Sequence, residues 1–158
     1  MVKGTKVSDV LIMAHEAMMT KLKTAWQQKS ALVQLATPAE LLILASIIEK
    51  ESGRESDRRT ISQVFHNRLQ RNMRLQTDPT VIYALGDGFD GDIRSRDLRM
   101  DSPFNTYKVK GLPPTAIALP SLDSLLAAAQ PSSGDYLYFV ARGDGTSQFS
   151  LLSLIHIS

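Results

Sequence analysis

The fold is decided by Thr37-Pro-Ala-Glu-Leu-Leu-Ile-Leu-Ala-Ser-Ile-Ile-Glu-Lys-Glu51, a stretch with the pattern of one buried helix. Thr37 stands where a helix cap is expected, and Pro38 takes the first helical position. Glu40 completes a capping box three residues after the cap. Because residues 41–48 are almost all apolar, we predict that this is the most buried helix of the protein.

The two acids at the end of this helix point in different directions. Successive residues of a helix are turned by about 100° around its axis, so residues three or seven positions apart lie on nearly the same side. Glu51 follows Ile48 by three positions and Leu44 by seven, so it points toward the centre of the apolar side. Glu49 lies further round, on the flank of the apolar side. Helix geometry therefore predicts that Glu51 is the more buried of the two carboxyl groups.

A carboxyl group on the buried side of a helix is costly as an anion unless it has a partner. Desolvation raises its pKa, and a carboxylic acid that is still protonated near neutral pH can act as a general acid. Glu51 is therefore a candidate catalytic residue. The alternative is that it forms an ion pair with one of the arginines that follow in the sequence.

In the rest of the chain, the spacing of apolar residues and the turn residues predict a mainly helical α+β fold with a small antiparallel hairpin near the C-terminus. No internal repeat or long linker interrupts it, so one structural unit is expected. Segments 87–92 and 102–120 are expected to be loops, because the first is rich in Asp and Gly and the second in Pro. The predicted elements are helices over Ser8–Lys29, Ser56–Arg71 and Leu122–Gln130, a short helix beginning at Thr77 or Asp78, and strands over Tyr136–Ala141 and Gln148–Ser150.

Composition excludes several kinds of function. The chain has 158 residues, no cysteine and a formal net charge of +2. Without cysteine there is no disulfide, no thiolate metal site and no cysteine nucleophile. The small positive charge does not by itself indicate a nucleic-acid-binding protein. No segment approaches the roughly 20 apolar residues of a membrane span.

Three charged patterns are weaker candidates for a site. The Asp-Gly segment 87–92 lacks the spacing and the final Glu of a calcium loop, so a solvated turn is predicted. The histidines are dispersed at positions 15, 66 and 156 and predict no metal site. The arginines of the third helix could face nucleic acid, but neighbouring acids and the lack of an aromatic series favour a solvent-facing helix side. These arginines are Arg58, Arg59, Arg68 and Arg71.

Several blocks of sequence resemble one known family. They are Leu44-Ala-Ser-Ile-Ile-Glu-Lys-Glu51, Val64-Phe-His-Asn-Arg-Leu69, Met73-Arg-Leu-Gln-Thr-Asp-Pro-Thr-Val-Ile-Tyr83, Ser102-Pro-Phe-Asn-Thr-Tyr107, Gly111-Leu-Pro-Pro114, Ile117-Ala-Leu-Pro120 and Tyr136-Leu-Tyr-Phe-Val140. In their order and spacing they resemble the YceG-like family, the endolytic murein transglycosylases. The resemblance covers residues 1–150.

The resemblance implies a lytic transglycosylase that cleaves the MurNAc–GlcNAc β-1,4 bond within nascent peptidoglycan strands and leaves a 1,6-anhydro-MurNAc end. It places the catalytic glutamate in the Ile-Glu-Lys-Glu block, at Glu51, with Glu49 as the alternative. No metal or cofactor is implied. The polar blocks supply candidate substrate-binding residues, whose other interpretation is capping and turn formation: Gln76, Thr77, Asp78, Asn105 and Tyr107.

The resemblance also implies where the protein acts. Family members carry an N-terminal membrane anchor and a small domain before the catalytic part, and neither is present here. Residues 1–150 are therefore interpreted as a catalytic domain truncated at both ends, and the full-length protein is expected at the extracytoplasmic face of the plasma membrane. Its expected partners are glycan strands and the cell-wall synthesis machinery, and no nucleic acid.

The end of the chain departs from the family pattern. After Ser150 the sequence reads Leu-Leu-Ser-Leu-Ile-His-Ile-Ser158, without the polar segment of the family. We therefore interpret residues 151–158 as a non-native tail, and His156 is not matched to a family histidine. The missing segment leaves an alternative function open, an inactive glycan-binding or scaffold fragment of the same family.

Overall fold

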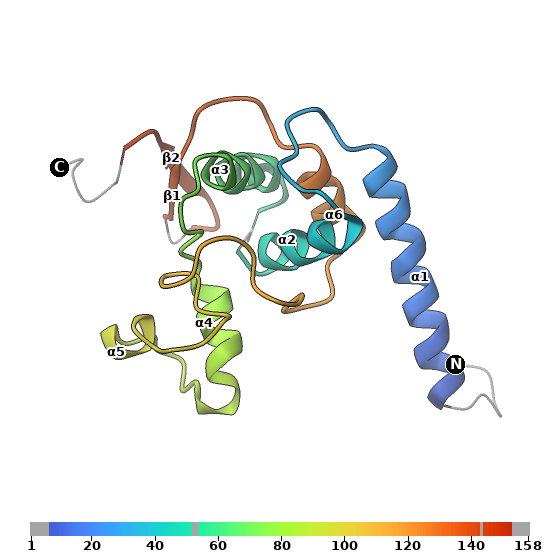
Figure 1. Ribbon diagram of the computed structural model, residues 1–158, viewed down its shortest axis with the longest axis horizontal. Coiled ribbons are helices and arrows are strands. Elements are labelled where there is room, and N and C mark those ends of the chain that lie inside the picture. Colours follow the sequence, from blue (N-terminus) through green and yellow to red (C-terminus); the bar gives the residue numbers. More distant parts are fainter. Residues whose placement is uncertain (1–6, 52–53, 143, 153–158) are drawn as a thin grey trace.

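The α+β fold class predicted from the sequence is confirmed by the structure, a computed structural model that describes residues 7–51, 54–142 and 144–152. Helices form the body and one short hairpin lies beside them (Figure 1). The α-helices are α1 Val7–Gln27, α2 Pro38–Glu51, α3 Arg58–Gln70, α4 Asp78–Leu85, α5 Ser95–Leu98 and α6 Leu122–Ala129, and the 3-10 turns are Glu55–Asp57 and Gly86–Gly88. The strands are β1 Tyr138–Ala141 and β2 Ser147–Ser150.

Helix α2 lies in the core with its apolar residues buried, but it is not the most buried helix as predicted, because α3 and α6 bury a larger share of their residues. Its capping box is present: Glu40 N donates to Thr37 Oγ1 at 3.3 Å, and Thr37 N donates to Glu40 Oε1 at 3.2 Å. The helix packs against α1, α3, α4 and α6. Burial of each large apolar side chain contributes about 1.5–3 kcal/mol, so α2 anchors the fold through its fully buried residues Leu41, Leu44, Ala45, Ile47 and Ile48.

Helices α3 and α6 complete the layer around α2 (Figure 1). Phe65 of α3 and Leu125 of α6 are buried in the same cluster as the α2 side chains. The Ser121 hydroxyl accepts a hydrogen bond from Ser124 N at 3.2 Å and so caps α6. His66 is buried between these helices, where its ring contacts Ala128 O at 2.8 Å.

Helix α1 packs on the core through its C-terminal half only, where Leu22 and Ala25 are buried. Its N-terminal half carries exposed apolar side chains, among them Leu11 and Met13. In the part of the chain that the structure describes, no helix has the length and apolar character to cross a membrane.

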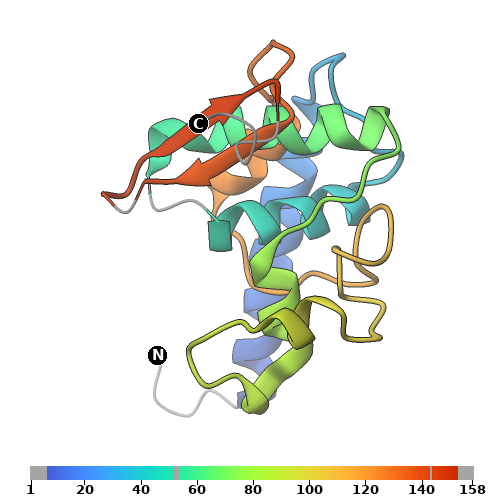
Figure 2. The same ribbon diagram turned by 90° about the vertical axis from the view of Figure 1, so that its left-hand side faces the viewer.

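The hairpin covers one end of α3 (Figure 2). Its strands are antiparallel, with Phe139 opposite Phe149, and the Phe139 ring meets Phe65 edge-on at 5.8 Å between centroids. The first strand begins two residues later than predicted, because side chains of α3 bond both backbone groups of Tyr136. Within the predicted 142–145 turn, residue 143 lies outside the described residues.

Helices α4 and α5 extend from the opposite side of α2 (Figure 2). The structure confirms the short helix predicted at Thr77 or Asp78, with Thr77 at the cap position and Pro79 in the first turn. The sequence did not predict α5, which begins where the Asp97 carboxylate accepts a hydrogen bond from Arg94 N at 2.8 Å. The predicted 102–120 loop has no helix or strand. Residues 153–158 of the predicted tail lie outside the described residues.

Candidate active site

A cleft of about 320 Å³ opens between the end of α2, the segment before α4 and the hairpin. That volume lies near the lower end of the about 300–1,000 Å³ typical of small-molecule sites. It brings together residues that are far apart in the sequence. The cleft is lined by Glu51, Arg68, Leu75, Gln76, Asp78, Tyr107, Phe139, Val140 and Ser147.

Glu51 lies at the last position of α2 and reaches the cleft with a partly buried side chain. Burial raises the pKa of its carboxyl group from 4.5 to about 7, and the nearby carboxylate of Asp78 adds to the increase. The carboxyl group is therefore still substantially protonated near neutral pH. This is the direction that the position of Glu51 on the apolar helix side predicted.

Asp78 and Tyr107 form a hydrogen-bonded pair in the same cleft as Glu51. The Tyr107 hydroxyl donates to Asp78 Oδ1 at 2.5 Å. Burial and the hydrogen bond to Asp78 raise the pKa of Tyr107 above its usual value of 10.0. The phenol thus remains a hydrogen-bond donor at every pH at which the protein would work.

Arg68 forms the floor of the cleft, and the sequence interpretation that placed it on a solvent-facing helix side was wrong. Its side chain is buried, and hydrogen bonds to backbone carbonyl groups satisfy it there. Nε donates to Leu137 O at 2.7 Å, and Nη1 donates to Arg74 O and Leu75 O at 3.0 Å each. The guanidinium also lies 5.0 Å from the centre of the Tyr138 ring. One sequence signal pointed to this position: Arg68 continues the spacing of the apolar residues on α3.

Gln76 is exposed in the cleft and has an unusual backbone conformation. Its φ of 52° lies in the left-handed region, which residues with a Cβ adopt at a cost. Gln76 N donates to Thr106 O at 3.2 Å, and Arg68 Nη1 donates to Gln76 Oε1 at 3.4 Å. These bonds hold the segment that carries Gln76 and Asp78 against the cleft.

The structure places Thr77 and Asn105 behind the cleft rather than on its surface. The Asn105 side chain is fully buried and donates to Leu98 O and Met100 O, while its Oδ1 accepts from Tyr107 N at 3.0 Å. The Thr77 hydroxyl is buried in a cluster with those of Thr80 and Thr106. Both residues therefore support the neighbours that do reach the cleft.

Glu49 is directed away from the cleft, toward α6. Its Oε1 accepts hydrogen bonds from Ser121 N at 2.6 Å and from the Ser124 hydroxyl at 3.0 Å. Burial by itself would raise the pKa of Glu49, but these bonds and the charge of Arg58 outweigh it and hold the pKa below 4.5. Glu49 is therefore held as an anion mainly by the hydrogen bonds from Ser121 and Ser124.

The sequence of the chain matches the YceG-like family over residues 1–152. The chain belongs to this family. An endolytic murein transglycosylase of Bacillus subtilis is 48% identical over 111 residues, which are 70% of this chain and 31% of that protein. One of Streptococcus pneumoniae is 41% identical over 110 residues, 66% of this chain and 20% of that protein. The chain thus spans less than a third of the length of these curated relatives.

A solved structure agrees with the YceG-like assignment. The crystal structure of a YceG-like protein from Listeria monocytogenes superposes with a TM-score of 0.70 and 41% sequence identity. The match covers 94% of this chain and 44% of the Listeria chain. The helices that form the core and position the cleft therefore have the fold of the YceG-like family.

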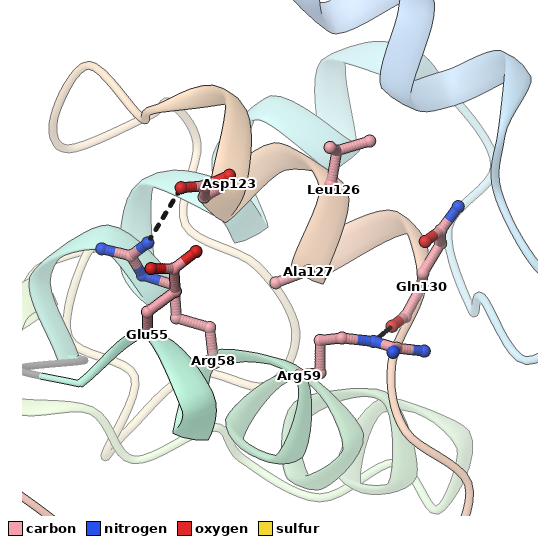
Figure 3. A pocket seen from close by; sticks show the side chains of 7 residues that line it. All are labelled: Glu55, Arg58, Arg59, Asp123, Leu126, Ala127 and Gln130. Carbon is pink, nitrogen blue, oxygen red and sulfur yellow. Dashed lines mark hydrogen bonds and ion pairs between the residues drawn. The ribbon is translucent and has the colours of Figure 1, made fainter.

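Figure 3 shows a second, smaller hollow of this YceG-like chain, of about 180 Å³, between α3 and α6. Asp123 faces Arg58 across it at 3.8 Å, and Arg59 Nε donates to Gln130 O at 2.7 Å. These two arginines connect α3 to α6. Of the four arginines on this helix and at its end, Arg59 and Arg71 are exposed, Arg58 is half-buried and Arg68 is buried.

Replacing Glu49 with Ala is expected to lower the free energy of unfolding by about 1–3 kcal/mol, because Ser121 N and the Ser124 hydroxyl lose their acceptor. The folded state holds the pKa of Glu49 below 4.5, so its contribution is present above pH 4.5 and is lost as the pH falls through the folded pKa. Urea denaturation at pH 7 and pH 3 measures both effects. A difference between variant and parent that is equal at the two pH values would contradict this assignment.

Proposed function

We propose that this YceG-like chain is the catalytic part of an endolytic peptidoglycan lytic transglycosylase. Its substrate would be the MurNAc–GlcNAc β-1,4 bond of nascent glycan strands, and its product would carry a 1,6-anhydro-MurNAc end. The names of the curated relatives support the general activity. The single observation that carries the assignment here is a carboxyl group with a pKa of about 7 in an open cleft, that of Glu51.

One carboxyl group is sufficient for this reaction. Ordinary glycosidases use two, one to protonate the leaving oxygen and one to attack the sugar or activate water. In the proposed reaction the C6 hydroxyl of MurNAc takes the place of water. Glu51 donates its proton to the glycosidic oxygen as the C1–O bond breaks. Oxygen O6 then bonds to C1, and the Glu51 carboxylate accepts the O6 proton, which restores the acid.

The other cleft residues have supporting roles in this proposal. The charge of Asp78 adds to the effect of burial on the pKa of Glu51, and in this proposal it also stabilises an oxocarbenium-like transition state. Tyr107 and Gln76 are available to hydrogen-bond the sugar. Thr77 and Asn105 act from behind the cleft by holding these residues in position.

The proposed substrate also fixes the place of action. Peptidoglycan strands lie outside the plasma membrane, so we propose that the whole protein works at that extracytoplasmic face. Other proteins of cell-wall synthesis are its proposed partners there. A formal net charge of +2 is compatible with an anionic cell-wall polymer but does not argue for one.

Product analysis tests the proposed function directly. Un-crosslinked glycan strands incubated with the protein should yield fragments whose mass corresponds to 1,6-anhydro-MurNAc ends. Fragments with reducing MurNAc ends would show hydrolysis and contradict the proposal. Retention of glycan strands without any cleavage would favour the alternative, an inactive glycan-binding or scaffold fragment.

Replacing Asp78 with Asn is expected to shift the pH dependence of turnover. The charge of Asp78 contributes to the raised pKa of Glu51, so its removal lowers that pKa, while burial still keeps it above 4.5. Activity is lost as the pH rises through the pKa of the general acid. The alkaline limb of the kcat profile should therefore move from about pH 7 toward lower pH. An unchanged alkaline limb would contradict the assigned coupling of the two carboxyl groups.

A further inference from the structure

A third hollow lies beside the end of α2 and the start of α4, which form a ridge between it and the cleft. Its volume is about 310 Å³, and it is lined by Lys50, Pro79, Ile82, Tyr83 and Ile117. Glu51 and Asp78 line the cleft, and their chain neighbours Lys50 and Pro79 line this hollow. The two hollows therefore flank the same pair of carboxyl groups.

The walls of this hollow are fixed by the fold. The Tyr83 ring lies 4.9 Å from the ring of Phe104, and Ile117 N donates to the hydroxyl of buried Ser46 at 3.0 Å. Phe104 belongs to the same short loop that carries Tyr107 into the cleft. A single loop thus supports both hollows, and the aromatic surface of Tyr83, 46% exposed, is held in place before any ligand binds.

The chemistry of the hollow suits a sugar. Aromatic and aliphatic side chains make up most of its lining, and they can pack against the apolar face of a pyranose ring and the methyl of an acetamido group. Lys50 adds an exposed cation at the edge, where it can meet a carboxylate on the same strand. A strand that is cut within its length has sugars on both sides of the broken bond, so it needs binding surface beyond the cleft that holds the carboxyl pair.

We propose that the hollow lined by Tyr83, Ile82 and Ile117 is a second sugar subsite, which binds the part of the glycan strand on the far side of the bond cleaved at Glu51. This inference rests on the proposed function, and it adds where the strand runs and which residue stacks on it. The strand passes from the hairpin side of the cleft over the α2–α4 ridge and onto the ring of Tyr83.

The subsite predicts that Tyr83 affects binding of long strands and not the chemical step. Tyr83→Ala should raise KM for long un-crosslinked strands by about tenfold, the effect of losing one well-placed aromatic contact, and should leave kcat within about twofold. Tyr83→Phe keeps the ring and should resemble the parent. On strands too short to cross the ridge, the parent and Tyr83→Ala should have equal KM values.

A matched control is available in the hairpin segment. Tyr136 is 39% exposed and its ring also contacts a phenylalanine, Phe149, but it lines neither hollow. Tyr136→Ala should leave KM unchanged for both strand lengths. Equal KM changes in Tyr83→Ala and Tyr136→Ala, or a Tyr83→Ala effect independent of strand length, would overturn the subsite.

Two further measurements keep the test decisive. If Tyr83→Ala fails to fold, Tyr83→Leu retains an apolar contact with Phe104 but removes the flat ring, and it should show the same rise in KM. If the parent makes no anhydro products, the proposed function fails, and binding of labelled long strands to the Glu51→Gln protein still reports on the hollow. About tenfold weaker binding when Tyr83→Ala is added supports the subsite, and unchanged binding overturns it.

Discussion

Replacing Glu51 with Gln is expected to lower kcat by about 10³–10⁴-fold, while glycan strands still bind. General acid–base catalysis by one group contributes about 10²–10⁴-fold, and in the proposed reaction the same carboxyl group acts first as acid and then as base. Gln has the same shape but cannot transfer the proton. Mass analysis of digested strands, together with a binding measurement on labelled strands, checks both parts of the expectation.

The same variant should be more stable than the parent at alkaline pH. The folded state raises the pKa of Glu51 from 4.5 to about 7, so folding favours the protonated carboxyl group. Below pH 4.5 the group is protonated in both states and has no cost. The cost of the anion grows above pH 4.5 and is complete above pH 7, where it reaches at most about 3 kcal/mol. Thermal unfolding should therefore show a higher Tm for Glu51→Gln at pH 8 and little difference at pH 4.

Glu49 provides the control for this prediction. Glu49→Gln keeps an acceptor oxygen for Ser121 N and the Ser124 hydroxyl, so we expect the variant to fold and to retain most of its turnover. Retained turnover in Glu51→Gln together with its loss in Glu49→Gln would transfer the catalytic role to Glu49. An unchanged Tm of Glu51→Gln at pH 8 would show that its carboxyl group is not buried as an anion.

Local pattern predicted the helix that carries the site. The capping box of Thr37 and Glu40 and the apolar run after it set the start and the buried side of α2. The turn of the helix then separates two acids that are only two residues apart in the sequence. Because both the start and the periodicity are local properties, the burial of Glu51 could be predicted before its surroundings were known.

Contacts between distant segments could not be predicted in this way. The partners of Glu49 lie more than 70 positions away at the start of α6, and nothing around Glu49 in the sequence distinguishes it from a solvent-facing acid. Asn105 and Gln76 both belong to polar blocks, but only the folded loop shows that one is buried and the other exposed. A polar side chain in the sequence indicates that hydrogen-bond partners are needed. The fold decides whether those partners are backbone groups of the protein or groups of a ligand.

The second large effect, on stability, is expected at Arg68, a buried residue that the sequence analysis placed on a solvent-facing helix side. Arg68→Met should lower the free energy of unfolding by about 3–5 kcal/mol, because each buried acceptor that is left without its donor costs about 1–3 kcal/mol. Three carbonyl oxygens lose their donor, those of Leu137, Arg74 and Leu75. Since these bonds join the segment before α4 to the hairpin, activity should fall with stability. Urea denaturation measures the change.

Substitution by Lys distinguishes the geometry of Arg68 from its charge. The guanidinium donates from Nε in one direction and from Nη1 in another, which a single ammonium group cannot reproduce. Arg68→Lys should therefore recover less than half of the stability that Arg68→Met loses. Arg71→Met, at the exposed end of the same helix, should change stability by less than about 0.5 kcal/mol. Full recovery with Lys would mean that a positive charge at this position, rather than the planar set of donors, holds the cleft together.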